Sequence, residues 1–547
     1  MRMSFPVRPA EPALMRVASS LGFLRSFAWL SVTTLVLAPT PAAAAMGPDD
    51  ARHLVARTGF GVTAAEIDRF AKLDRAQAVD ALLATAHPQP DIAPPRFEDH
   101  ASVPAPGRSL TPEERREFVR DQNQQTQALR GWWVEQMLAT TSPLTERMTL
   151  FWHNHFVSSQ QKVRLARLMY LQNATFRANA LGSFRTLLHA AAREPAMVVY
   201  LDSVRNRKGA PNENFAREVM ELFTLGEGRY TEQDVKEAAR AFTGWSIERP
   251  SGAFVDRPRL HDDADKTVFG HRGRYDGDDV LDLILARPET ARFIVGKLWR
   301  EFVSPDPDAA AVTRIAADFQ RADYDLKVAL RALLLEPAFW AAEHRGTLVK
   351  SPVELVVGTL HTLGVQPDNA AAFATASAGM SQVLFAPPNV KGWPGGDTWI
   401  NSTTLLARKQ FLAAIAHPAM APSDDVQATA MIGVAATPMG DAAMPPARDG
   451  ARMPGIVAGS DAPVVDAALQ RARAARVVER ALARLQFGPA AWIGAQPGAD
   501  LPARLATAQR VLLPLPPVTD DVAEARAQRD AVLFVRAALL DPVYELK

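Results

Sequence analysis

The stretch GAPNENFAREVMELFTLGEGRYTEQDVKEAARAFTGW, residues 209–245, decides the fold class of this chain. Its first half places apolar side chains at helical spacing, which forms a core stripe of Phe215, Val219, Leu222 and Phe223. Gly226 or Gly228 is suited to end this helix, because glycine readily adopts left-handed backbone angles. Thr231, followed by Asp234, has the spacing of a capping box. The stretch therefore predicts two consecutive helices joined by a glycine turn.

The face opposite the stripe is polar and carries Asn214, Arg217, Glu218 and Glu221. Arg217 lies four residues from both Glu213 and Glu221, and such pairs stabilise an exposed helix by only about 0.2–0.5 kcal/mol each. Two interpretations remain open. The face is either an exposed network of ion pairs, or a buried cluster in which Glu218 and Glu221 act as acid and base or as metal ligands.

Helical spacing continues along nearly the whole chain. It predicts a long helix over 112–139, opened by Thr111 with Glu114 in capping-box position. Only residues 245–270 are typical of strands, with Trp-Ser-Ile and Ala-Phe-Val on either side of a Pro-Ser-Gly turn. We therefore expect a mainly α fold: a large multi-helix domain with one short β-hairpin and a C-terminal helical segment.

Four regions are expected along the chain. Residues 1–45 have the basic start, the short apolar run and the Ala-Ala-Ala end of a secretory signal peptide, although Met15 is an alternative start. Residues 46–417 form the main helical domain, and residues 418–463, rich in Ala, Pro, Met and Gly, form a linker. Residues 464–547 form helices that pack back on the main domain.

Composition narrows the functional classes. Removal of the signal takes away four arginines and one glutamate, which leaves 57 basic and 59 acidic residues. This balance gives no electrostatic footprint for a nucleic acid, and we expect no transmembrane segment in the mature chain. Cysteine is absent, so thiol catalysis and cysteine metal ligands are excluded. We expect a periplasmic or extracellular location.

The segment RMTLFWHNHF, residues 147–156, contains the histidines with the clearest chemical potential. On a continuous helix Arg147, Phe151 and His155 share one face, and His153 lies about 200° away from His155. One metal ion can therefore bind both histidines only if the helix ends near His153. The alternatives are a helix end with buried, hydrogen-bonded imidazoles and a site in which at least one histidine acts.

Two loops are further candidates. His261, Asp262 and Asp265 offer ligands for a divalent cation, or are simply solvated loop charges. Trp393 lies in the Pro- and Gly-rich segment 387–396, and together with Trp245 and Trp399 it offers either a sugar-stacking platform or core packing.

These segments together resemble the bacterial family known as domain of unknown function 1800. The resemblance covers roughly residues 48–417 and the final Leu-Leu-Asp-Pro-Val-Tyr, and it rests on ordered motifs: Leu54–Gly61, Arg147–Phe156, Asn206–Gly209, Pro211–Trp245, His261-Asp262, Phe293–Phe302, Lys350–Glu354 and Pro388–Gly395. It implies an exported, mostly helical protein, often encoded beside a second exported protein that resembles sulfatases and alkaline phosphatases. It supplies no catalytic assignment that could be carried over to this chain.

Two hypotheses for the function follow. The first is an extracytoplasmic enzyme for acid–base or metal-assisted hydrolysis of a polymer or conjugate. In it His153 or His155 serves as ligand or base, Glu218 and Glu221 as acid or ligands, and Arg217 as an anion clamp, with the loop of His261 as a third wall. The second is a non-catalytic exported protein that binds or assembles with the co-exported sulfatase- or phosphatase-like partner. The identity of any metal or cofactor stays open.

Overall fold

The computed structural model describes residues 44–97, 110–248, 251–416 and 464–547. The predicted linker 418–463 lies outside the described residues, and so does the predicted signal peptide except for its last two residues. Ala44–Lys547 forms one compact unit.

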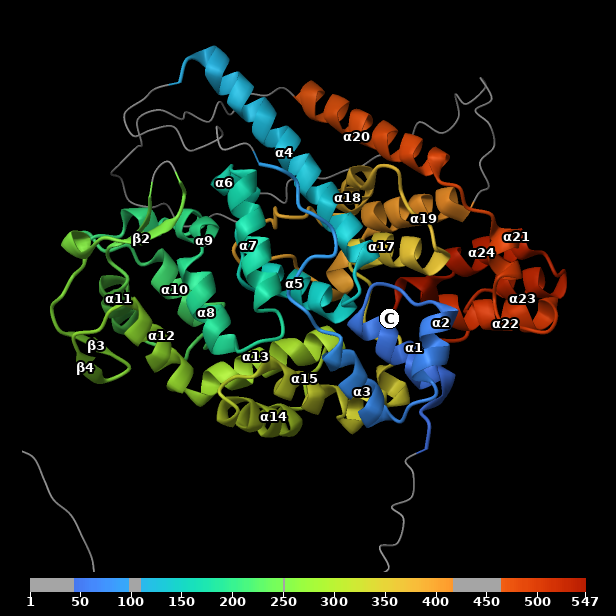
Figure 1. Cartoon of the computed structure of the whole chain (residues 1–547), viewed down its shortest axis with the longest axis horizontal. Helices are drawn as coiled ribbons and strands as arrows, with labels where there is room; N and C mark the ends of the chain where they lie inside the picture. Colours follow the sequence, from blue (N-terminus) through green and yellow to red (C-terminus); the bar gives the residue numbers. More distant parts are fainter. Residues whose placement is uncertain (1–43, 98–109, 249–250, 417–463) are drawn as a thin grey trace, which may run out of the picture. The chain divides into compact units, whose positions relative to one another are not determined.

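The protein is mainly α, as the sequence predicts, with 24 α-helices in the described residues (Figure 1). The first half contains α1 (Gly47–Thr58), α2 (Ala64–Phe70), α3 (Arg75–Ala84), α4 (Pro112–Ala139), α5 (Pro143–His155), α6 (Gln160–Val163), α7 (Ala166–Ala178), α8 (Phe184–Arg193), α9 (Pro195–Tyr200), α10 (Asn214–Glu221) and α11 (Glu232–Ala241). The second half contains α12 (Gly277–Ala286), α13 (Pro288–Phe302), α14 (Ala309–Arg321), α15 (Leu326–Leu334), α16 (Pro337–Trp340), α17 (Pro352–Leu363), α18 (Ala370–Gly379), α19 (Ser402–Ala416), α20 (Val464–Arg484), α21 (Pro489–Gly494), α22 (Leu501–Leu512), α23 (Asp520–Ala527) and α24 (Ala531–Leu540).

The helix starts follow the local chemistry of the chain. Thr111 accepts a hydrogen bond from the backbone of Glu114, whose carboxylate accepts one in return, so α4 has the predicted capping box and the predicted bounds. Thr231 and Asp234 form the same box at the start of α11. These boxes satisfy backbone N–H groups that a helix start leaves unpaired.

Two small antiparallel hairpins follow α11. The predicted hairpin pairs β1 (Trp245–Ile247) with β2 (Phe254–Asp256), in a register that sets Trp245 opposite Asp256. A second hairpin, β3 (Lys266–Val268) with β4 (His271–Gly273), was not expected from the sequence. Val268 is fully buried, and β3 packs on α11.

The core consists of two clusters of buried apolar residues, and α5 contributes to both. Its Met148 and Trp152 belong to the cluster built from α1–α3 and α8–α15, and its Leu150 belongs to the cluster built from α4, α17–α19 and the C-terminal helices. Figure 1 shows α5 near the middle of the helices. α5 is therefore packed against both clusters, and the histidines near its end are enclosed by the fold.

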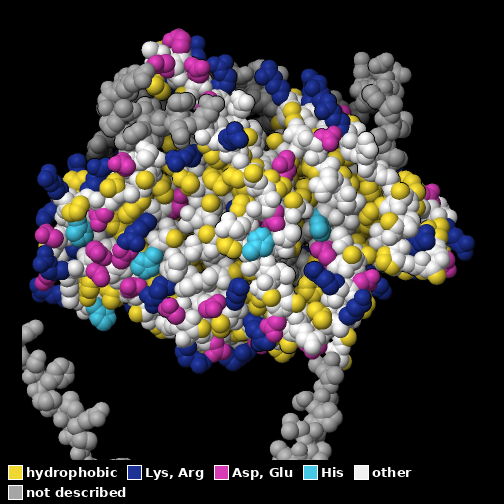
Figure 2. All heavy atoms as spheres, viewed as in Figure 1, with side chains coloured by type: hydrophobic (Ala, Val, Ile, Leu, Met, Phe, Trp, Pro, Cys, Tyr) yellow, Lys and Arg dark blue, Asp and Glu magenta, His cyan; other side chains and the backbone are white. Residues whose placement is uncertain are grey.

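The C-terminal helices pack on this body: α24 contacts α19, and α22 contacts α1 and α2. None of the described helices has both the length and the apolar character needed to cross a membrane. Figure 2 shows basic and acidic side chains interspersed over the visible face, in keeping with a formal net charge of only +1.

Candidate functional site

α10 presents its apolar side to the core, as its sequence predicts. Phe215, Val219 and Phe223 are at most 3% exposed, and Leu222 is half-buried. The helix begins at Asn214, slightly later than the motif Pro211-Asn212 suggests. The opposite side, which we call the α10 polar face (Asn214, Arg217, Glu218 and Glu221), is neither fully solvated nor fully buried.

Arg217 holds α10 against α11. Its guanidinium donates to both carboxylate oxygens of Glu232, at 2.7 and 2.8 Å, and to Glu213 at 3.1 Å. The pair with Glu213 was expected, whereas Glu232 takes the place expected for Glu221. The carboxylates of Glu213 and Glu232 therefore occupy the terminal N–H groups with which Arg217 would bind an anion. The geometry instead favours a role for Arg217 in positioning α10 relative to α11.

Glu218 is the titratable group of the face with the most unusual environment. Burial, followed by the negative charge of Glu221, raises the pKa of Glu218 to about 7, while Arg217 and Lys391 oppose the rise. No hydrogen bond from the described residues is among the influences on this pKa. A carboxyl group whose pKa lies close to neutral is suited to give or accept a proton.

Glu221 and Tyr200 both interact electrostatically with Glu218, and Tyr230 is bonded to Glu221. The hydroxyl of Tyr230 donates to Glu221 at 2.9 Å. Burial, followed by the charge of Glu218, raises the pKa of Tyr200, the last residue of α9, to about 12. The phenol of Tyr200 therefore stays protonated and lies within electrostatic reach of Glu218.

Lys391 reaches the face from a loop far away in the sequence. Asn154, near the end of α5, accepts a hydrogen bond from the backbone N–H of Trp393 at 2.6 Å and donates to its carbonyl at 3.4 Å. Gly392 has a φ of +90°, and a Cβ added there would lie 2.3 Å from the Asn154 Oδ1 atom. Only glycine fits this contact, so α5 fixes the loop backbone next to Lys391.

His155 lies against the end of α10 but is not free to act. Its Nε2 donates to the carbonyl of Phe223 at 3.0 Å, and its Nδ1 accepts from the ammonium of Lys297 on α13 at 3.1 Å. Burial, followed by the charge of Lys297, lowers the pKa of His155 well below its usual range. The imidazole is neutral, 3% exposed, and joins α5, α10 and α13.

His153 lies on the other side of α5. The amide of Asn173 on α7 donates to its Nε2 at 3.1 Å, and the rings of Trp133 and Phe176 lie 4.8 and 4.9 Å from the imidazole. Burial, followed by the charge of Arg177, lowers the pKa of His153 to about 3. Because α5 continues through His155, the two histidines have different neighbours and cannot share one metal ion.

The loop of His261 is tied to the end of α11. His261 Nδ1 contacts the carbonyl of Thr243 at 2.9 Å, and Asp262 accepts from Arg240 at 2.7 Å. The ammonium of Lys266 donates to the backbone carbonyls of Asp262 and Ala264, at 2.5 and 3.0 Å. The carboxylates of Asp262 and Asp265, which a divalent cation would need, are paired with Arg240 and Arg272. None of these bonds joins the loop to the α10 polar face.

Two other predictions about ligands can be compared with the structure. Among the residues it describes, no three His, Cys, Asp or Glu side chains are grouped in a way that could hold a metal ion. Trp245, Trp393 and Trp399 are each 4% exposed and belong to the two core clusters. The idea that these tryptophans form an exposed stacking platform is therefore wrong.

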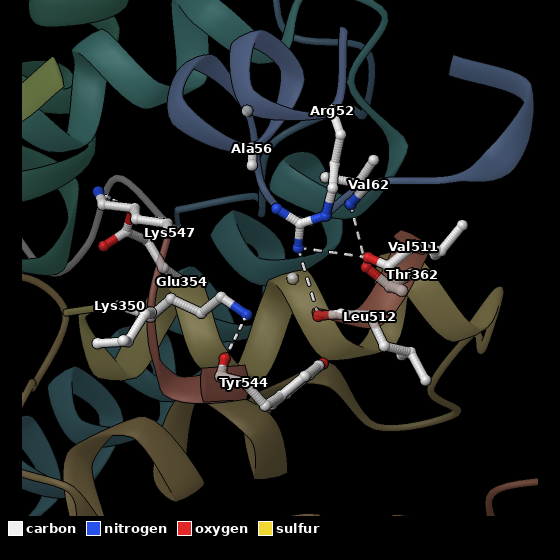
Figure 3. A pocket seen from close by; sticks show the side chains of 14 residues that line it. Arg52, Ala56, Val62, Lys350, Glu354, Thr362, Val511, Leu512, Tyr544 and Lys547 are labelled. Atoms are coloured by element: carbon white, nitrogen blue, oxygen red, sulfur yellow. Dashed lines mark hydrogen bonds and ion pairs between the residues drawn. The ribbon is translucent and has the colours of Figure 1, made fainter. Parts of the chain in front are cut away.

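A second concentration of charge, which the sequence did not predict, is buried where α17 meets the C-terminal residues. We call it the buried charge cluster, and it comprises Arg147, Glu301, Lys350, Glu354, Arg408, Glu545 and Lys547. A cavity of about 20 Å³ lies beside this cluster, and Lys350 and Arg52 are among its lining residues. Figure 3 shows the two side chains approaching it from different elements. Burial, followed by the charge of Arg52, lowers the pKa of Lys350 to about 7.

The buried charge cluster is best explained as a structural device. Its cavity has room for about one water molecule, so no substrate fits there. Lys350 donates to the carbonyl of Tyr544 at 2.6 Å, and Glu354 pairs with both Arg147 and Lys547. These contacts fasten residues 544–547 to α17.

Sequence reasoning thus found the α10 polar face but missed Tyr200, Tyr230, Lys391 and Lys297. Only the position of Lys391 in a rigid Pro- and Gly-rich loop could have indicated a functional role for it from the sequence. The others lie in segments that only the tertiary fold brings together.

Comparison with known proteins gives one match. No curated protein and no solved structure matches this chain. A family model described as "Protein of unknown function (DUF1800)" matches residues 53–508. The match spans well over half of the chain, so the protein belongs to the DUF1800 family.

Proposed function

We propose that this protein is an exported bacterial hydrolase in which Glu218 acts as a general acid at the α10 polar face. The observation that supports this most is the position of Glu218: half-buried, next to Glu221 and within reach of Tyr200 and Lys391. Export is proposed from the signal-like residues 1–45, and it would place the enzyme in the periplasm or the medium.

The proposed reaction adds water across a bond of a polymer or conjugate. A water molecule held by Glu221 attacks the electrophilic atom and gives its proton to that carboxylate. The protonated Glu218 gives its proton to the leaving oxygen as the bond breaks, and the two carboxyl groups then exchange the proton through solvent. Lys391 offsets negative charge on the substrate, and Arg217 keeps α10 in place.

The histidines have supporting roles in this scheme. Both ring nitrogens of His155 are already bonded, and His153 is enclosed by aromatic rings. We therefore propose that they shape the end of α5, which carries Asn154 and through it the loop of Lys391. Metal-assisted hydrolysis receives no support from the grouping of side chains in the described residues.

The experiment combines a substrate screen with a leaving-group test. Purified mature protein is offered p-nitrophenyl phosphates, sulfates, glycosides and carboxylate esters, and the class that turns over is repeated with alkyl leaving groups. Glu218→Gln should lower kcat/KM about 10²–10⁴-fold for alkyl leaving groups, which need a proton, and much less for p-nitrophenolate. Glu227→Gln, an exposed carboxylate in the turn after α10, is the matched control and should leave both rates unchanged.

Two results would reject the proposal. One is no turnover of any class by the wild-type protein. The other is equal rates for the wild-type protein and Glu218→Gln with both kinds of leaving group.

A second candidate function is binding to a co-exported partner. Leu405 and Leu406 on α19 and Leu533 on α24 are 37–53% exposed, and these two helices pack on each other. Sedimentation of this protein mixed with the sulfatase- or phosphatase-like protein encoded beside it tests this directly. A complex that is lost in Leu406→Glu favours assembly, and separate sedimentation of the two proteins rejects it.

A further inference from the structure

A cavity of about 310 Å³ lies between α1 and the helices α22 and α23, and its lining includes four arginines. Arg52 comes from α1, Arg345 from the segment after α16, Arg510 from α22 and Arg526 from α23. Asp49 is the one carboxylate among its lining residues. A volume of this size is at the lower end of the range for small-molecule sites.

The positive charges are only partly compensated. Arg52 donates to the backbone carbonyls of Arg510, Val511 and Leu512, at 2.6, 3.5 and 3.3 Å, so it caps the end of α22. Arg345 pairs with Asp50, but Asp50 also pairs with Arg75. Two cations therefore share that carboxylate.

The two arginines nearest to solvent have the weakest partners. Arg510 is 3.3 Å from Asp49, whose side chain is 77% exposed, and exposed pairs of this kind hold loosely. Arg526 donates to the neutral amide oxygen of Gln509 at 3.4 Å. Their guanidinium groups therefore keep N–H donors for an incoming acceptor.

The positive charge of the arginines also affects the neighbouring imidazole of His53. His53 lines the same cavity, and burial, followed by Arg57 and with further contributions from Arg345 and Arg52, lowers its pKa to about 3. A positive field around the imidazole is one of the causes of this shift.

Part of the remaining lining is a continuous apolar segment. Leu513, Pro514, Leu515 and Pro516 follow α22 along one side of the cavity. Leu515 packs so closely on Gly346 that a Cβ there would lie 2.6 Å from its Cδ1 atom. Arginine on one side and a Leu–Pro surface on the other suit a ligand with a charged end and an apolar body.

We propose that this cavity is a binding site for a small organic anion, in which a phosphate, sulfate or carboxylate group is held by Arg510 and Arg526 and an apolar body rests on residues 513–516. Arginine binds such groups through paired, charge-assisted hydrogen bonds. The site is separate from the α10 polar face and does not depend on the function proposed there.

Calorimetric titration of the mature chain tests the site at constant ionic strength, with phenyl phosphate, phenyl sulfate and benzoate as probes and sodium chloride as reference. Inorganic phosphate alone shows whether the apolar body contributes. We expect at least one phenyl anion to bind with sub-millimolar affinity and more tightly than inorganic phosphate. The preferred probe identifies the anionic group.

Variants locate the binding. Arg510→Gln combined with Arg526→Gln changes two exposed side chains and should weaken binding about 10-fold or more, because each loses a charge-assisted hydrogen bond. Arg321→Gln, which removes a 77% exposed charge on α14, is the control and should bind within 2-fold of the wild-type protein. Absence of binding by all probes at 10 mM, or an equal loss in the control, would overturn the proposal.

Discussion

The buried pair of Glu146 and Arg177 is predicted to be among the most sensitive sites for the stability of the protein. Glu146 on α5 is 1% exposed and accepts from Arg177 at 2.5 and 3.0 Å. It also accepts from the indole of Trp133 and the amide of Gln136, both at 3.1 Å. Glu146→Gln keeps the shape but turns an amide N–H₂ toward some of these donors and leaves the buried Arg177 charge without a counter-charge.

The size of the effect follows from burial. Breaking a buried ion pair costs about 3–5 kcal/mol, because the remaining charge is left out of water. Unfolding entropy of about 2.1 cal/mol/K per residue gives about 1 kcal/mol/K for a unit of about 500 residues. If Ala44–Lys547 unfolds in one step, Glu146→Gln should therefore lower Tm by about 3–5 °C.

Glu232→Gln is the matched control. Glu232 also forms a two-oxygen pair with an arginine, Arg217, but its side chain is 68% exposed, so its loss should cost less than about 1 kcal/mol. Calorimetry of both variants makes the comparison. Melting temperatures of the two variants within 1 °C of each other would refute the reasoning. Burial would then not determine how much an ion pair contributes to the free energy of unfolding.

Two further predictions concern acid sensitivity and the loop of Lys391. In the folded protein His53 and His153 have pKa values of about 3, and that of His155 is also depressed, so below pH 6.5 the unfolded chain binds protons that the folded protein does not. Their contribution to stability is therefore complete above pH 6.5 and is lost as the pH falls toward 3. The slope of the unfolding free energy against pH measures the number of protons that the chain takes up on unfolding. Near pH 5 this number should be lower by about one in His153→Gln than in the wild-type protein. An unchanged slope would contradict a depressed pKa of His153 in the folded protein. Gly392→Ala should destabilise the protein by more than Gly395→Ala. Both glycines have a positive φ, but an added Cβ clashes with Asn154 only at position 392. Equal unfolding midpoints of the two variants in urea would show that the contact between Gly392 and Asn154 is not tight.

Local features of the fold were predictable because their causes are local. Thr111 and Glu114 lie three residues apart and determine the start of α4 between themselves. The first hairpin was recognisable from its turn residues and its flanking β-prone residues. The second hairpin has strands of only three residues and is stabilised by packing on α11. The sequence of residues 266–273 alone therefore does not predict it.

The candidate site was predictable only in part. Helical spacing was enough to place Glu218 and Glu221 on one face of α10. The pKa of Glu218 is raised mainly by burial, and the pKa of His155 is lowered by burial and then by Lys297. Burial and the contact with Lys297 both come from tertiary packing, which the sequence pattern does not reveal. The buried charge cluster escaped prediction for the same reason, since its members come from well-separated segments.

The most direct test of the account is the titration of Glu218 itself. Carbon-13 NMR of protein labelled at the glutamate carboxyl carbons, with Glu218→Gln to assign the signal, measures its pKa in the folded state. We predict a midpoint near pH 7 that moves lower in Glu221→Gln, because burial and the neighbouring carboxylate raise it. A midpoint near 4.5 that does not respond to Glu221→Gln would contradict the claim that the α10 polar face holds a proton donor at neutral pH.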